Sequence, residues 1–409
     1  MTRLWNRNFS IVTIGSFISA LGSAAAGVAF GILVYTETGS PLMLAMFFVA
    51  NVVPRIVASF LAGPYVDRHS RRNIIVTIDY FYSLFFLAMG LVLFTGFFNV
   101  WVFTAISALI GTIDTIYQTA FMSLFPETVP KGSHSKAYSI ASLIWPLSAA
   151  IMAPIAAYFI DNFSNGTAIL MIFNAVTFVV TASIELLINV KENLNDSQIE
   201  KRQFITDIRE SIHYFKHERG ILGIALLFGA FAFVYAVGDL LRMPFFVSSP
   251  NFTIQDYSFL ISAGAIGRIV GGLVHYVFRL PVEKKFTIAI VVYFTVEVLD
   301  ATMLFMPYIL MITMSFIVGL LGVTSFNIRM AATQTYVSDN IRGRVNATQQ
   351  LIWNFGSIAG AVAAGLIAEY SGLDYRIIIM FAAVVSISSI FLIPLRMKDE
   401  FKKIYNVEV

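Results

Sequence analysis

Twelve long apolar runs recur along this chain of 409 residues. A helix needs about 20 predominantly apolar residues to cross the ~30 Å hydrocarbon core of a membrane. Each run meets that length, so each is predicted to be a membrane-spanning helix. The runs cover residues 9–35, 42–66, 73–94, 100–125, 137–160, 167–190, 221–247, 257–278, 286–306, 308–337, 346–368 and 376–395.

The composition agrees with a chain that is surrounded mainly by lipid. Charged residues make up 12% of the sequence, about half of the ~25% expected in a soluble domain, and hydrophobic residues make up 58%. The mean hydropathy is +0.78. These values exclude a soluble globular protein, a disordered chain and a nucleic-acid binder. The absence of cysteine excludes disulfides, thiolate nucleophiles and cysteine metal sites.

One hydrophilic stretch divides the spans into two sets of six. Residues 191–220 carry six basic and six acidic side chains, and they separate an N-terminal bundle, 1–190, from a C-terminal bundle, 221–395, which is followed by a cytoplasmic tail, 396–409. Within the linker, apolar residues recur at helical spacing at Phe204, Ile208, Ile212 and Phe215. We expect an amphipathic helix on the membrane surface, with a charged soluble coil as the alternative.

The loop charges predict the topology. Most of the 27 Lys and Arg residues fall in loops on one side, and only Arg376 falls in the loops on the other side. By the positive-inside rule, both termini are cytoplasmic in a multi-pass protein of a bacterial cell membrane. No small-residue cleavage site follows the first run, so we expect it to be retained as a span.

The two halves show a weak internal repeat. Aligning them places Leu143-Ile144-Trp145 on Leu351-Ile352-Trp353 and Gly63 on Gly271. Transporters are often built from such repeats. Two homologous bundles of six helices that face one another would enclose a cavity at the membrane midplane.

A charged motif follows the second run. It reads Gly63-Pro-Tyr-Val-Asp67-Arg68-His-Ser-Arg71-Arg72. Gly63 permits a close helix approach, and Asp67 can accept hydrogen bonds from a helix N-terminus or pair with arginine. The positive-inside rule alone would explain Arg71 and Arg72, but it does not explain the spacing of the glycine, the aspartate and Arg68.

This motif, the twelve spans and the half-repeat together resemble the major facilitator superfamily over nearly the whole chain. The resemblance implies two pseudo-symmetric six-helix bundles, transport by alternating access, and a cytoplasmic latch that the motif forms in the outward-open state. In the second half Gly271 is kept but His275 stands at the position of Asp67, so a strong latch is not expected there.

Further stretches are similar to the drug/proton antiporter branch, and within it to exporters of the macrolide-efflux type. These are Thr38-Gly39-Ser40-Pro41, Val53-Pro54-Arg55 and Asp79, which lies seven residues beyond Arg72. Antiporters of this branch carry a glycine-rich element in the fifth span. This chain has alanine at the glycine positions of that element, in the pattern Ala149, Ala153, Pro154 and Ala157, which keeps the small-residue spacing.

Ionisable residues within spans are costly, so each is a functional candidate. Outside the loops the sequence has four arginines and six acids, namely Arg55, Arg242, Arg268, Arg329, Asp79, Asp114, Glu185, Asp239, Glu297 and Asp300.

Asp114 is the main candidate for a proton carrier or cation contact, with Gln118 one turn further on the same face. The resemblance implies that the fourth span lines the cavity, and burial favours the neutral form of a carboxyl, which could then exchange a proton for substrate. The alternative is a carboxylate locked to an arginine of a facing helix. Arg55 and its approximate repeat counterpart Arg268 could pair with Asp114 and Asp79 or hold an anionic substrate. Arg329 either lines the cavity or reaches the interface.

The other charges have separate interpretations. Asp239 and Arg242 stand three residues apart and could form an intrahelical ion pair at an outer gate. Glu297 and Asp300 share a face of the ninth span, so either one of them is protonated or an arginine faces them. Glu185 is expected at the interface. Within the spans, Trp145 and Trp353 could stack on an amphipathic solute or pack in the core.

Motifs of enzymes are missing from the sequence. No ATP-binding G-x-x-x-x-G-K-[ST] string and no G-x-S-x-G string occur, and the five histidines suggest no metal cluster. We therefore expect no enzyme activity, cofactor or metal. The predicted function is a secondary active exporter, coupled to protons, for an amphipathic drug-like compound or secreted metabolite. Its partners would be a small-molecule substrate, protons and membrane lipids, without nucleic acid, and the chain would be a monomer. The alternatives are a membrane sensor or scaffold that does not transport, and an importer or lipid flippase of the same fold.

Overall fold

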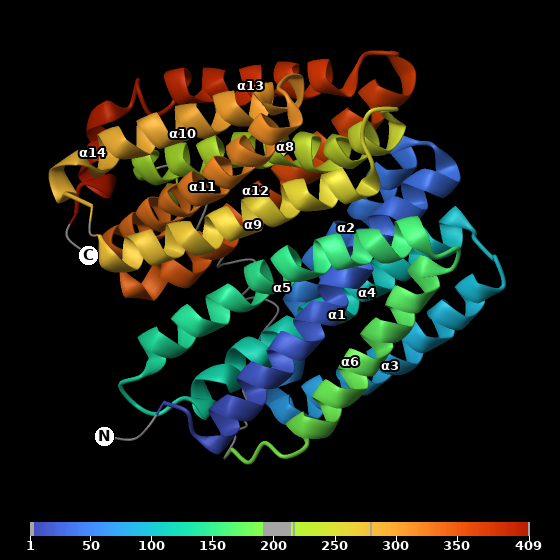
Figure 1. Ribbon diagram of the computed structural model, residues 1–409. Helices are drawn as coiled ribbons and strands as arrows, with labels where there is room; N and C mark the ends of the chain where they lie inside the picture. The colour runs from blue at the N-terminus through green and yellow to red at the C-terminus, as the bar shows by residue number, and fades with distance from the viewer. Residues whose placement is uncertain (1–3, 191–213, 216, 279, 408–409) are drawn as a thin grey trace. The chain divides into compact units, whose positions relative to one another are not determined.

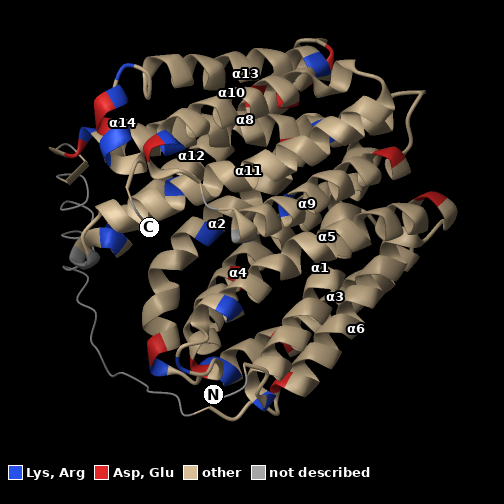
Figure 2. Ribbon diagram, turned by 60° about the vertical axis from the view of Figure 1, so that its left-hand side comes forward, with Lys and Arg blue, Asp and Glu red and all other residues tan. Residues whose placement is uncertain are grey.

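The computed structural model describes residues 4–190, 214–215, 217–278 and 280–407. In this part of the chain all regular structure is helical (Figure 1). Twelve helices are long and apolar enough to cross a membrane, which confirms the twelve predicted spans. Figure 2 shows that the charged residues gather at helix ends, with a small number along the helices.

The first compact unit consists mainly of six helices that follow one another in the chain. They are α1 (Arg7–Thr38), α2 (Pro41–Arg68), α3 (Arg71–Phe94), α4 (Val100–Thr128), α5 (His134–Asn162) and α6 (Gly166–Glu185). Polar side chains set several helix starts: Asn6 caps α1 by accepting from Phe9 N at 2.9 Å, and Asn99 caps α4 by accepting from Trp101 N at 3.0 Å. Helix α1 ends at Gly39, whose φ of 62° lies in the left-handed region that glycine tolerates.

Small residues bring the helices of this unit together. Helix α1 packs on α5 and α6, and α3 packs on α4 and α6. A Cβ atom at Gly22 of α1 would lie 2.0 Å from Thr177 Oγ1 of α6, so only glycine fits there. Two turns towards the N-terminus of α1, the Thr181 hydroxyl of α6 donates to Gly15 O of α1 at 3.1 Å. The α1–α6 contact is therefore both close and hydrogen-bonded.

The second unit repeats this arrangement. It consists mainly of α8 (Arg219–Ser248), α9 (Ile254–Val277), α10 (Lys285–Thr302), α11 (Tyr308–Tyr336), α12 (Asp339–Tyr370) and α13 (Tyr375–Leu392), with short 3₁₀ turns at Val282–Lys284 and Met303–Phe305. Here α8 packs on α12 and α13, and α10 packs on α11 and α13. These pairs correspond in chain order to the pairs of the first unit, which confirms two pseudo-symmetric bundles.

An additional helix, α14 (Lys398–Tyr405), lies in the segment that we expected to be a tail. Phe401, Ile404 and Tyr405 are buried in the core of the second unit. The hydroxyls of Tyr405 and Tyr293 are 3.0 Å apart, and burial raises the pKa of Tyr405 to about 12, so this phenol stays protonated. The apolar positions of α14 therefore complete a core instead of facing water.

Several helix limits differ from the apolar runs. Helix α6 ends at Glu185 although the run extends to 190, and α12 begins at Asp339 although the run begins at 346. Hydropathy locates the part of a helix that lies in lipid, whereas hydrogen bonding and capping set where the helix ends. Of the predicted linker stripe, Phe204, Ile208 and Ile212 lie outside the described residues. Phe215 is buried against the core of the second unit.

Candidate functional site

The first unit contains a cavity of about 670 Å³ that is bounded by all six of its helices. The lining combines aromatic rings with small and polar side chains, and it includes Ser16, Ser19, Ser23, Gly27, Phe30, Phe47, Asn51, Tyr82, Phe86, Asp114, Tyr117, Gln118, Phe121, Met122, Phe125, Tyr138, Ser142, Trp145, Asn174 and Phe178. A volume of this size suits a small organic molecule.

Helix α1 supplies one polar face of this cavity. Ser16, Ser19 and Ser23 recur at the three- and four-residue spacing that places side chains on one side of a helix. Gly27 continues this face, and a Cβ atom there would meet nothing within 4 Å. This face of α1 therefore presents hydroxyl groups to the cavity and leaves free space beside Gly27.

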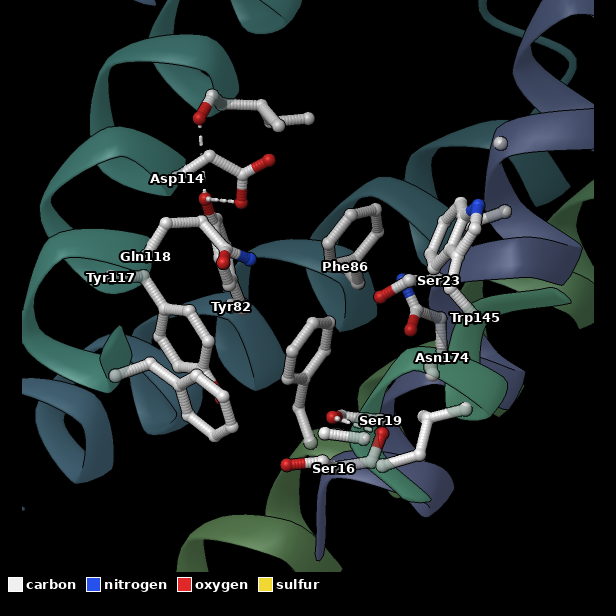
Figure 3. A pocket seen from close by; sticks show the side chains of 18 of the residues that line it. Ser16, Ser19, Ser23, Tyr82, Phe86, Asp114, Tyr117, Gln118, Trp145 and Asn174 are labelled. Atoms are coloured by element: carbon white, nitrogen blue, oxygen red, sulfur yellow. Dashed lines mark hydrogen bonds between the residues drawn. The ribbon is translucent and has the colours of Figure 1, made fainter. Parts of the chain in front are cut away.

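The opposite side of the cavity combines aromatic rings with a carboxyl group. Figure 3 shows Asp114, Tyr117 and Gln118 of α4 on the side away from the serines, with the Phe86 ring between the two sides. Trp145 of α5 also lines the cavity, and 58% of its surface is exposed. The cavity thus offers rings for stacking as well as hydrogen-bonding groups.

Asp114 is the centre of a polar cluster at the cavity wall. Arg55 Nη2 of α2 lies 3.1 Å from Asp114 Oδ2, and the Tyr82 hydroxyl donates to Oδ1 at 3.0 Å. Arg55 also donates to Asn51 Oδ1 at 3.3 Å. The side chains of Arg55 and Asp114 are 45% and 34% exposed, so the protein does not enclose this ion pair. The sequence left Asp114, Asp79 and an anionic substrate open as partners of Arg55. In the structure, Arg55 is paired with Asp114.

Hydrogen bonds between α2 and α4 fix how the two helices are aligned, and so they place Arg55 beside Asp114. Ser107 of α4 donates to Phe47 O at 2.9 Å, and Asn51 of α2 donates to Ser107 O at 3.1 Å. Between them and the ion pair, a Cβ atom at Gly111 would lie 2.1 Å from Asn51 O. The two backbones are therefore in contact one turn before Asp114.

In this conformation, two arginines of the motif after the second span contact other helices of the first unit. Arg71 Nη1 lies 2.5 Å from Glu127 Oε1 at the end of α4, and Arg72 donates to Leu186 O beyond α6. Asp67 and Arg68 form no ion pair within the described residues. A Cβ atom at Gly63 would meet nothing within 4 Å.

Asp79 and Glu185 lie together inside the first unit. Both side chains are fully buried, and the two carboxyl groups interact directly with one another. The expectation that Glu185 lies at the interface is therefore wrong. Helix α6 packs so closely on α1 and α3 that its last residue is enclosed, although it stands near the end of the apolar run.

Charges also meet in the second unit. Arg242 Nη2 of α8 lies 2.5 Å from Asp300 Oδ2 of α10, and the Ser386 hydroxyl of α13 is 2.5 Å from Glu297 Oε2. The sequence left two explanations for Glu297 and Asp300, which lie in α10, the ninth span: one of them is protonated, or an arginine faces them. The structure shows an arginine facing Asp300. Asp239 is exposed and interacts electrostatically with Arg242 and with the exposed Arg268.

The remaining candidates lie in different surroundings. The Arg329 guanidinium stacks over the Phe228 ring, with Cζ 4.2 Å from its centroid. Trp353 is partly buried against the core of the second unit, whereas its repeat counterpart Trp145 lines the cavity of the first. In the alanine element, Ala153 and Ala157 are buried in α5, which continues as a helix through Pro154, and Ala149 is partly buried.

Sequence reasoning missed several residues of the site. The serine face of α1 had a detectable signal, because its spacing is helical. Asn51, Tyr82 and Glu127 had none, since their contacts depend on how neighbouring helices are aligned. Within the described residues, no group of three or more His, Asp or Glu side chains could hold a metal ion.

Comparison with known proteins identifies the family. A model of the transmembrane secretion effector family matches residues 1–405. The chain belongs to this family. The chain is a membrane transporter with the major facilitator fold, and a transporter of this fold implies a small-molecule substrate.

Its relatives include efflux proteins. Macrolide efflux protein A of Streptococcus pyogenes is 21% identical over 394 residues, which cover 94% of this chain and 95% of that protein. The protein of the same name from Enterococcus faecalis is 27% identical over 242 residues, 58% of this chain and 72% of that one.

Solved structures confirm the fold. A bacterial homologue of the iron transporter ferroportin, in an inward-facing state, aligns with a TM-score of 0.71 at 14% identity, over 97% of this chain and 98% of that one. The nucleoside transporter NupG aligns with a TM-score of 0.69 at 14% identity, over 95% and 99%.

Proposed function

We propose that this transporter exports an amphipathic small molecule in exchange for protons, and that Asp114 carries the proton. The observation that supports this most directly is the position of Asp114. It is a partly exposed carboxyl in the wall of a cavity of mixed polarity, and it is paired with Arg55. A carboxyl that is in reach of both water and substrate can respond to both.

The pairing with Arg55 suggests how a proton could be exchanged for substrate. When Asp114 is ionised, it attracts the guanidinium at 3.1 Å. When a proton binds Asp114, this attraction is lost and Arg55 is free to reorient. A ligand that binds preferentially to one of the two states shifts the equilibrium between them, so proton and substrate binding become linked.

The lining of the cavity suggests the class of substrate. Aromatic rings favour apolar ring surfaces, and the serine hydroxyls of α1 together with Asn174 offer hydrogen bonds. A molecule with both kinds of surface would satisfy this lining. Because two relatives are named macrolide efflux proteins, a macrolide is the first compound to test.

The remaining sequence assignments complete the proposal. They are the latch formed by Gly63, Asp67, Arg68, Arg71, Arg72 and Asp79, the outer gate of Asp239 and Arg242, the bundle limits at 190 and 221, the cytoplasmic termini and the monomeric state. Arg268, Arg329 and Trp353 stay candidates for the substrate pathway.

Transport by the purified protein tests the proposal. In liposomes with an imposed pH gradient, we expect a radiolabelled macrolide to move against its own concentration gradient. It should move in the direction opposite to the protons. Dissipating the gradient with an ionophore should stop this accumulation. If uptake is the same in protein-free liposomes, the macrolide is not a substrate, and if it follows the protons, the direction of coupling is wrong.

Trp145 provides a second test, through ligand binding. Replacing Trp145 by Ala removes a stacking surface from the cavity, so macrolide binding should weaken about tenfold, which corresponds to ~1.4 kcal/mol. Binding can be measured as ligand-dependent thermal stabilisation of the purified protein. Trp101 is the matched control, because it is also 58% exposed but does not line the cavity. Equal losses in Trp145→Ala and Trp101→Ala would contradict a role for the cavity.

A further inference from the structure

Two acidic side chains are enclosed between α3 and α6. The side chains of Asp79 and Glu185 are both 0% exposed. Their carboxyl groups lie within hydrogen-bonding reach of one another. No other donor among the described residues bonds to any of their four oxygens. Each carboxyl is therefore a buried polar group without a hydrogen-bond donor, and the group that it interacts with is a second acid.

Two carboxylates in this position could not both be ionised. Like charges at hydrogen-bonding distance repel strongly where the dielectric constant is low, and a buried charge without a partner is unfavourable by itself. A proton placed between two carboxyl groups removes this repulsion and supplies the missing hydrogen bond. The burial of both carboxyls without a hydrogen-bond donor therefore favours at least one bound proton.

The surrounding helices add few charges. From α1 the pair is faced by Gly15, where a Cβ atom would lie 3.4 Å from Glu185 Oε1. From α4, Tyr117 interacts electrostatically with both acids and also with Asp114. On α3 the titratable groups are Tyr82 and, two turns from Asp79, Arg72, whose guanidinium bonds to Leu186 O. Two phenols thus face the pair from α3 and α4, and the Arg72 guanidinium is bound to the backbone beside Glu185.

These two phenols also line the cavity. Tyr117 lines the cavity and interacts electrostatically with Asp79, Glu185 and Asp114. Tyr82 also lines the cavity, donates a hydrogen bond to Asp114 at 3.0 Å, and interacts with Asp79. A hydroxyl that both donates and accepts can pass a proton from one neighbour to the next.

We propose that Asp79 and Glu185 form a proton-binding site of the first unit, distinct from Asp114, which exchanges protons with the cavity through Tyr117. With one proton the pair shares it and has a net charge of −1. A second proton, taken from water in the cavity, makes the pair neutral. The site does not depend on the transport function, because it binds protons without substrate.

Infrared difference spectroscopy of the purified full-length protein tests the site. At neutral pH exposed carboxyls are ionised, so the difference between wild type and the double variant Asp79→Asn/Glu185→Gln should contain the carbonyl stretch of a protonated carboxylic acid. Raising the pH should diminish this band. The exposed acid Glu37 is the control, and Glu37→Gln should leave the band unchanged. A difference spectrum without the band would overturn the proposal.

Single variants guard against loss of folding. Asn and Gln keep the size and hydrogen bonding of the acids, but if the double variant does not fold, Glu185→Gln alone can be measured. Since a shared proton gives a band that depends on both carboxyls, the band should shift or vanish. An unchanged band would show that the proton belongs to another group.

Isotope exchange tests the path through Tyr117. After transfer to D₂O the band should shift as the proton is replaced, and the replacement should be slower in Tyr117→Phe than in wild type. Tyr138→Phe is the matched control, because Tyr138 also lines the cavity but is not among the groups that interact with the pair. Equal exchange rates in the two variants would contradict the path, and macrolide transport plays no part in this readout.

Discussion

Replacing Asp114 by Asn should abolish the accumulation of substrate driven by a pH gradient, down to the level of protein-free liposomes. Asn is nearly the same size as Asp, and it can still accept a hydrogen bond from Tyr82, but it cannot bind and release a proton. The variant should therefore fold and insert normally, with the Tyr82 contact preserved. The measurement is uptake of radiolabelled macrolide in liposomes with and without the gradient.

A second measurement on the same variant separates coupling from binding. Exchange of labelled for unlabelled substrate across the membrane needs no net proton movement, so Asp114→Asn should retain it. Arg55→Lys is a useful comparison, because it keeps a cation beside Asp114 and should retain part of the gradient-driven uptake. Gradient-driven uptake at the wild-type rate in Asp114→Asn would show that another group carries the proton.

Replacing Gly111 by Ala should destabilise the first unit and disturb the ion pair. The added Cβ would lie 2.1 Å from Asn51 O, which is a backbone atom and cannot rotate away, so α2 and α4 must separate. Overpacking of this kind typically costs about 1–3 kcal/mol. The midpoint of thermal unfolding of the purified protein should fall, and gradient-driven transport should fall with it, because Arg55 and Asp114 are on the helices that separate.

Gly27 provides the matched control. The same substitution, Gly27→Ala, adds a Cβ where nothing lies within 4 Å, so it should leave the thermal midpoint unchanged or slightly higher. If the two alanine variants were equally stable, the contact between α2 and α4 would not be as close as described.

The spans could be predicted from the sequence because hydropathy reports the surroundings of each residue one at a time. The family resemblance rested on the motif at Gly63–Arg72 and on span order, and the family match supports it. Neither hydropathy nor the family resemblance could predict which charged residues form ion pairs with one another. Arg55 was left with two acids to choose from, because the choice depends on how α2 is aligned along α3 and α4.

Burial near helix ends was also beyond the sequence. Glu185 stands near the end of an apolar run, where an interfacial position is the usual outcome, yet close packing by α1 and α3 encloses it. Trp145 and Trp353 occupy equivalent places in the repeat and have different surroundings, one at a cavity and one against a core. A repeat in the sequence conserves the helices more closely than it conserves what fills the space between them.

Helix α14 has a consequence for assembly during synthesis. It follows all six spans of its unit in the chain, and its buried Phe401 and Tyr405 pack beside Phe286 and Tyr293 of α10. All six spans can therefore be inserted while this part of the core is still open. The core of the second bundle is completed only after α14 has been synthesised, whereas the core of the first bundle is formed by its spans and by residues directly beside them, such as Ile188. Quality control that senses exposed apolar surface would thus have a longer interval to act on the second bundle than on the first.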